Sequence, residues 1–180
     1  MTDIPIDSNV GGYFGPFLKF SGFDVIELTG KAEEDVIIVI DGNKGTVSIE
    51  KAPLEHKDAH VLGEELTTMY AEDDNDRKNV AVVCSGSAAD HCNLSMLNFT
   101  FYDPKRNVVR LKQAGRGGIG RVFADKHIKA LVCHFKGVKA NLNHVYDISI
   151  LNRVATSRWN FRPSRFRTVS YTHLTLPTKA

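Results

Sequence analysis

The sequence predicts an α+β domain in which most strands pair antiparallel. Two observations favour this class: strand-like and helix-like apolar patterns are mixed along the chain, and two pairs of strand-like runs are each joined by a short turn-forming segment. The 180 residues, 42% of them hydrophobic, suffice for one domain with a buried core. No apolar run approaches the roughly 18 residues of a membrane span. The N-terminus lacks the basic start and apolar stretch of a signal peptide.

The first half of the chain should form two helices and three strands. Apolar residues at i, i+3 and i+4 predict helices at Tyr13–Phe20 and Val61–Tyr70. Strand-like runs occupy Asp24–Leu28, Val36–Ile40 and Thr46–Ile49. The second of these, VIIVI, is apolar and β-branched throughout, so both of its faces should be covered. Asp41–Gly45 has turn chemistry and should close a hairpin, whereas the acidic run Ala71–Arg77 is interpreted as a solvated loop.

The second half follows the same logic, with a second hairpin closed by Asp103–Asn107. The predicted elements are a buried strand at Asn79–Cys84, a short helix or loop at 88–94, the hairpin strands Leu97–Tyr102 and Val108–Leu111, a short helix ending near Lys126, a strand at Ile128–Phe135 and a helix at Val145–Ala155.

Charge and cysteine content exclude several kinds of site. The net charge of +2 arises from residues 157–180, which hold five basic residues and no acid; residues 1–156 hold 18 basic and 21 acidic residues, so nucleic-acid binding is not expected. Cys84, Cys92 and Cys133 form no Cys-x-x-Cys pair and are interpreted as reduced thiols of a cytosolic protein. The histidines beside Cys92 and Cys133 lack a third donor at ligand spacing, so no metal-ligating residue is predicted in this chain, and no catalytic residue either.

Two glycine-containing segments, each followed by a predicted helix, are the candidate binding loops. Gly115-x-Gly117-x-x-Gly120 formally matches a dinucleotide fingerprint. That interpretation needs a parallel βαβ unit and an acid about 20 residues on, and Lys139–Asn143 contains none. A tight turn that packs a helix closely is one alternative, and a non-catalytic nucleotide- or phosphate-binding module using Gly115–Gly120 is another.

A third interpretation combines both segments. Glycines let backbone N–H groups approach an anion, and a guanidinium can clamp a phosphate through two bonds. Arg116 stands inside one loop, and Asn9-Val10-Gly11-Gly12 precedes the first helix. The two loops should therefore converge on one phosphate-bearing ligand, although about 100 residues separate them.

At this point the sequence resembles a known family. SNVGGYFGPFLKFSGFDVIELTGKAE is similar to the N-terminal domain of tungsten-containing aldehyde ferredoxin oxidoreductases, and QAGRGGIGRVFADKHIKAL resembles a second segment of that domain in matching order and separation. The resemblance covers about residues 7–136. It implies a cofactor in which the dithiolenes of two pterins hold tungsten or molybdenum, with a 4Fe-4S cluster close by. The residues that it assigns to cofactor binding are Asn9, Gly11, Gly12, Ala114, Gly115, Arg116, Gly117 and Gly118.

The resemblance also implies the activity of an intact parent enzyme. That enzyme would oxidise aldehydes to carboxylic acids with ferredoxin as electron acceptor, or run a related low-potential reduction. Its expected partners are ferredoxin, a small aldehyde, the remaining domains of the parent chain and further copies of itself, in the cytoplasm, without nucleic acid or membrane. The cluster-binding Cys-x-x-Cys-x-x-x-Cys run of the family is absent here, and Phe17 stands where relatives commonly have an acid. The chain alone should therefore be inactive, and a purely structural fragment is the remaining alternative.

The domain should be a layered base for the pterins, with two β-sheets and flanking helices, truncated at both ends. We expect it to span residues 1–156. Residues 157–180 are interpreted as a non-native or disordered tail, because VSYTHLTLPT at 169–178 resembles a translated sequencing adaptor.

Overall fold

The computed structural model describes residues 5–53, 58–136, 147, 149–150 and 153–154. The chain divides into two compact units, Met1–Ala140 and Asn141–Ala180, and the elements below belong to the first. They are α1 (Phe14–Phe20), β1 (Val36–Asp41), β2 (Thr46–Lys51), α2 (Ala59–Tyr70), β3 (Val80–Cys84), β4 (Leu97–Asp103), β5 (Val108–Ala114), α3 (Ile119–Asp125) and β6 (Ile128–His134), with short 3-10 helices at Asp76–Asn79 (η1) and Ser87–Asp90 (η2). None of the helices among these residues is long and apolar enough to cross a membrane.

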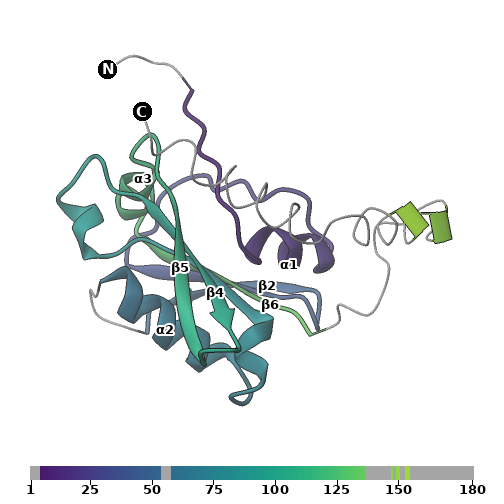
Figure 1. The fold of residues 1–180 in the computed structure, drawn as a ribbon. Coiled ribbons are helices and arrows are strands. Elements are labelled where there is room, and N and C mark those ends of the chain that lie inside the picture. The colour runs from purple at the N-terminus through teal and green to yellow at the C-terminus, as the bar shows by residue number, and fades with distance from the viewer. Residues whose placement is uncertain (1–4, 54–57, 137–146, 148, 151–152, 155–180) are drawn as a thin grey trace. The chain divides into compact units, whose positions relative to one another are not determined.

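The strands form one mixed sheet of six, in the order β2-β1-β6-β3-β4-β5 (Figure 1). Only β1 and β6 pair in parallel. The α+β class and both hairpins are confirmed. The expectation of two sheets is wrong for the described residues, because β6 lies between β1 and β3 and joins the two hairpins into a single sheet.

Each face of the sheet has its own apolar core. We call the side on which α1 packs the α1 face and the opposite side the α2 face (Figure 1). Strand β1 contributes side chains to both cores. Ile38 and Ile40 lie on the α1 face, and Ile37 and Val39 lie on the α2 face. The prediction that VIIVI is covered on both sides is therefore confirmed, and all seven residues of β6 are buried as well.

The predicted strand Asp24–Leu28 is wrong. These residues form no strand, although Ile26 and Leu28 pack against the α1-face core. The apolar side chains that suggested a strand are thus satisfied by covering the sheet rather than by joining it. Helix α2 begins at Ala59, two residues before the predicted start, because the carboxylate of Asp58 accepts hydrogen bonds from the N–H groups of His60 and Val61 at 2.8 and 3.0 Å.

The acidic run Ala71–Arg77 is exposed at residues 72–75, as predicted for a solvated loop, but its last two residues are buried, which corrects the prediction there. Asp76 and Arg77 are 5% and 8% exposed. Asp76 accepts hydrogen bonds from the N–H of Glu72 and the amide of Asn79, and one of its oxygens lies 2.9 Å from His134 Nε2. His134 is thus a satisfied structural histidine. Asp76 can be buried because its carboxylate accepts hydrogen bonds from Glu72 N and Asn79 and lies beside His134 and Lys136.

The remaining predictions concern cysteines and the C-terminus. All three cysteines are free; Cys84 and Cys133 are buried, whereas Cys92 is exposed. Burial raises the pKa of the Cys133 thiol to about 11, so it is no nucleophile at neutral pH. Most of the predicted helix Val145–Ala155 and the whole of residues 157–180 lie outside the described residues.

Candidate functional site

The two candidate loops lie side by side. The backbone N–H of Arg116 donates a hydrogen bond to Ser8 Oγ at 3.0 Å. A Cβ added to Gly117 would stand 2.1 Å from Ile6 Cγ2, so the segment before α1 is in close contact with the loop after β5. The predicted convergence of the two loops is confirmed. Their binding of one ligand stays a prediction.

Lys112 lies at the same place and was missed by sequence reasoning. A Cβ on Gly11 would stand 3.4 Å from Lys112 Nζ, so the ammonium group is beside the first glycine loop. Strand β5 pairs Lys112 with Phe99, and residues directly opposite on neighbouring strands share a face. Phe99 packs against the α1-face core. Side chains alternate between the two faces of a strand, so Lys112, two residues before the predicted site residue Ala114, could have been identified as its neighbour on that face.

Two cations, Lys112 and Arg116, lie beside the loops. Lys112 Nζ lies 5.5 Å from the ring centroid of Phe101, a cation–π arrangement. Among the described residues, neither Lys112 nor the guanidinium of Arg116 has a carboxylate partner. Arg116 is exposed, as is Asn9. Two cations without acidic partners beside open backbone suit an anionic ligand.

The first loop leaves open space for a ligand. Gly12 has a φ of +135°, which favours glycine, and a Cβ there would meet nothing within 4 Å. The peptide at Gly12 can therefore be approached closely from outside. A glycine is favoured at position 12 by the positive φ and by the open space beside the peptide, and not by close packing.

The second loop has a different reason for its later glycines. Gly118 has a φ of +64°, and a Cβ there would stand 2.0 Å from the carbonyl oxygen of Asn93. A Cβ on Gly120 would stand 2.5 Å from the carbonyl oxygen of Met96. The alternative of a tight, closely packed turn is therefore correct for these two positions. Ala114 is 1% exposed and belongs to the α1-face core, so neither its side chain nor its backbone is open to a ligand.

The dinucleotide interpretation of Gly115–Gly120 does not fit this topology. The loop follows β5, which pairs only with antiparallel β4, and β5 and β6 on either side of α3 are not neighbours in the sheet. A dinucleotide fold needs adjacent parallel strands around the glycine loop. The described residues also contain no group of three or more His, Cys, Asp or Glu side chains placed to hold a metal.

Comparisons with known proteins place the chain in a family. Residues 1–135 match the family model described as aldehyde ferredoxin oxidoreductase, N-terminal domain. The tungsten-containing aldehyde ferredoxin oxidoreductase of Pyrococcus horikoshii is 37% identical over 125 residues, and that of Pyrococcus furiosus is 33% identical over 129; each alignment covers 69% of this chain and 18% of the relative.

A solved structure is similar as well. The active-site complex BamBC of benzoyl-coenzyme A reductase, in complex with 1,5-dienoyl-CoA, has a TM-score of 0.54 and 27% identity, covering 71% of this chain and 17% of that one. The chain thus spans less than a fifth of the length of the relatives that it matches. Residues 1–135, which the family model matches, contain both glycine loops, and the chain belongs to the aldehyde ferredoxin oxidoreductase family, as its N-terminal domain.

Proposed function

We propose that this chain binds the phosphate-bearing pterin part of a tungsten cofactor in a full-length oxidoreductase. The observation that carries the proposal is the hydrogen bond from Arg116 N to Ser8 Oγ, which brings together two glycine loops and two cations that have no carboxylate partner among the described residues. Lys112 and Arg116 would bind the phosphates, and the backbone at Gly11 and Gly12 would approach the ligand without steric hindrance.

The residues present fit such a group on the α1 face. The open backbone at Gly12 and the ammonium beside Gly11 provide space and positive charge. The buried side chain of Ala114 and the packed glycines 118 and 120 hold the second loop rigid, so its donors are already positioned before a ligand arrives. The cofactor would supply the redox chemistry, and this chain would bind and orient it.

The full-length reaction that we propose is oxidation of an aldehyde to a carboxylic acid with ferredoxin as acceptor, in the cytoplasm. It is supported by the names of the curated relatives at 31–37% identity. A reduction of a thioester-activated ring is the second candidate, favoured by the 27% identity to benzoyl-coenzyme A reductase. The 4Fe-4S cluster of the proposal would be bound by parts of the protein beyond this chain.

Metal content of the full-length protein tests the cofactor proposal. Arg116→Ala should lower the tungsten and pterin content per protomer, while the metal-free protein melts at an unchanged temperature. Arg116→Lys should retain only part of the tungsten and pterin content, because an ammonium group cannot form the two parallel hydrogen bonds of a guanidinium. Arg106→Ala is the matched control, since Arg106 pairs with Asp103 in the exposed β4–β5 turn. Full tungsten occupancy in Arg116→Ala would show that this guanidinium does not hold the cofactor. Failure of the metal-free variant to fold would favour a structural role.

A further inference from the structure

The segment Pro5–Val10, which we call the arm, is fixed against the loop that follows β5. Near the start of the arm, Ile6 contacts this loop so closely that a Cβ added to Gly117 would stand 2.1 Å from Ile6 Cγ2. At the end of the arm, Val10 packs against the α1-face core. Ser8 lies between these two contacts and is half-buried. The position of Ser8 is therefore determined by contacts on both sides of it in the sequence.

The hydroxyl group of Ser8 has an unused donor within the described part of the chain. Its oxygen accepts a hydrogen bond from the backbone N–H of Arg116 at 3.0 Å. A serine hydroxyl also carries one O–H donor, and no described residue accepts a hydrogen bond from it. A hydroxyl that accepts one hydrogen bond is polarised by it and becomes a stronger donor. The O–H of Ser8 is thus a positioned donor that has no acceptor among these residues, immediately before the first glycine loop.

The side chains that surround the two loops define the class of ligand for this donor. The hydroxyl of Ser8, the guanidinium of Arg116 and the ammonium of Lys112 beside Gly11 all donate hydrogen bonds. A phosphate group offers several acceptor oxygens and negative charge, so it can bind a hydroxyl and a cation at the same time. A neutral ligand would gain nothing from the two positive charges. The hydroxyl and both cations therefore suit the same phosphate-bearing ligand.

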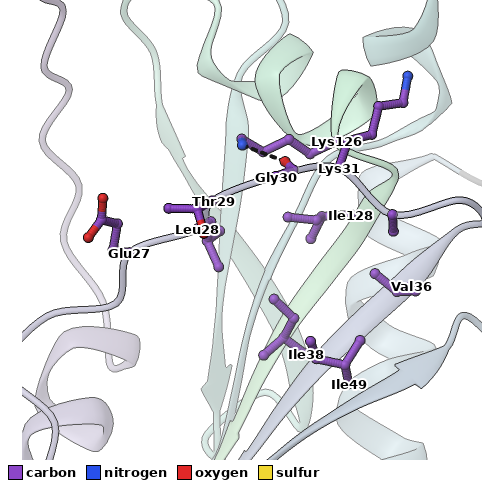
Figure 2. Close-up of a pocket in the computed structure, with 11 residues that line it drawn as sticks. Glu27, Leu28, Thr29, Gly30, Lys31, Val36, Ile38, Ile49, Lys126 and Ile128 are labelled. Carbon is purple, nitrogen blue, oxygen red and sulfur yellow. Dashed lines mark hydrogen bonds between the residues drawn. The ribbon is translucent and has the colours of Figure 1, made fainter.

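The groove in Figure 2 has the opposite character. It has a volume of ≈ 400 Å³, and apolar side chains such as Ile38 and Ile128 form its floor (Figure 2). The ammonium of Lys126 donates to the carbonyl of Gly30 at 2.7 Å, and that of Lys31 is directed away from the floor (Figure 2). A phosphate in this groove would lose its hydration against apolar surface. The glycine loops are therefore the better place for a phosphate.

We propose that the Ser8 hydroxyl donates a hydrogen bond to a phosphate of the cofactor and is a third phosphate-binding side chain beside Lys112 and Arg116. The N–H of Arg116 holds the oxygen of Ser8, so that the hydroxyl proton is directed to the ligand. The hydroxyl thereby connects the two loops through one bond that it accepts and one that it donates. This inference deepens the proposed function and rests on it.

The tungsten and pterin content of the full-length protein, measured for three substitutions of Ser8, tests the proposal. Ser8→Thr keeps a hydroxyl and should retain the wild-type content, whereas Ser8→Ala removes it and should lower the content several-fold. Ser8→Asp keeps an acceptor for the N–H of Arg116 but places a carboxylate where the phosphate should lie, so it should lower the content further than Ser8→Ala does. Wild-type content in Ser8→Asp would overturn the proposal, because Ser8 would then only position Arg116. Wild-type content in Ser8→Ala would overturn it equally.

Hydrogen exchange of the Arg116 amide in the 180-residue chain gives a readout that needs no cofactor. The exchange should be several-fold faster in Ser8→Ala than in the wild type and in Ser8→Asp, because only Ser8→Ala removes the acceptor of this N–H. Comparison with Arg116→Ala separates the two proposals. Loss of tungsten in Arg116→Ala together with full tungsten in Ser8→Ala would overturn the role of Ser8 and leave the proposed function unchanged. Full tungsten in Arg116→Ala would count against the guanidinium, whereas the Ser8 variants would still decide the role of the hydroxyl.

Discussion

Single residues in the loop after β5 carry two different kinds of constraint. Gly118 and Gly120 are fixed by close backbone contacts, whereas Lys112 and Arg116 are cations without acidic partners among the described residues. The sequence pattern Gly115-x-Gly117-x-x-Gly120 does not separate these roles, because the sequence does not distinguish a glycine needed for packing from one needed for ligand approach. Lys112 could have been predicted from the alternation along β5, since it is two residues before the buried Ala114.

Gly118→Ala should destabilise the protein without touching the proposed ligand contacts. An alanine there would be strained by the left-handed φ of +64°, and its Cβ would clash with Asn93 O at 2.0 Å, so the backbone would have to shift. We expect the free energy of unfolding in urea to fall by about 2 kcal/mol or more. Gly15→Ala is the control: this helical glycine in α1 has nothing within 4 Å of an added Cβ, so the change should stabilise by up to about 1 kcal/mol. Equal effects of the two substitutions would show that the contact with Asn93 is not a constraint.

At the scale of elements, Asp76 ties η1 to the end of β6. Burial by itself raises the pKa of this carboxyl, but hydrogen bonds from Asn79 and the N–H of Glu72, with the charges of His134 and Lys136, outweigh it and hold the pKa below its ordinary value. An acidic run such as Ala71–Arg77 predicts a solvated loop by composition. The burial of Asp76 within it depends on His134, 58 residues away, which a local pattern does not reveal.

The lowered pKa of Asp76 predicts how stability changes with pH. A carboxyl whose pKa is depressed in the folded state contributes stability above its unfolded pKa of about 3.9, and that contribution is lost as the pH falls through the folded value. Asp76→Asn should therefore cost about 2 kcal/mol at pH 7 and progressively less below about pH 4. Urea unfolding of both proteins between pH 7 and pH 2 measures this. A difference that stays constant across that range would contradict the electrostatic account.

Elements were predictable where the signal is local. Both hairpins follow from turn residues at Asp41–Gly45 and Asp103–Asn107, and α2 follows from its apolar spacing. The segment Asp24–Leu28, wrongly predicted as a strand, has the apolar composition of a true strand. Its position on the α1 face depends on which strands pair with one another in the sheet. Backbone pairing of that kind is non-local and is not encoded in a five-residue window.

For the whole molecule, the decisive non-local event is the insertion of β6 between β1 and β3. It converts two separate hairpins into one sheet, whereas the sequence predicted two sheets. It also leaves β2 and β5 as the outer strands. The two outer strands have distinct surfaces on the α1 face: β5 offers cations beside the glycine loops, and β2 exposes the apolar side chains of Val47 and Ile49. The α1 face is therefore the face to which we assign the cofactor.

A crystal structure of the tungsten-loaded full-length protein tests the central claim most directly. The distance to be measured joins the cofactor's phosphate oxygens to Lys112 Nζ and to the guanidinium nitrogens of Arg116. The account predicts that at least one phosphate lies within about 3.2 Å of one of these cations, on the α1 face beside Gly11 and Gly12. A cofactor whose phosphates are bound elsewhere, with both cations facing water or acidic side chains of other domains, would contradict it.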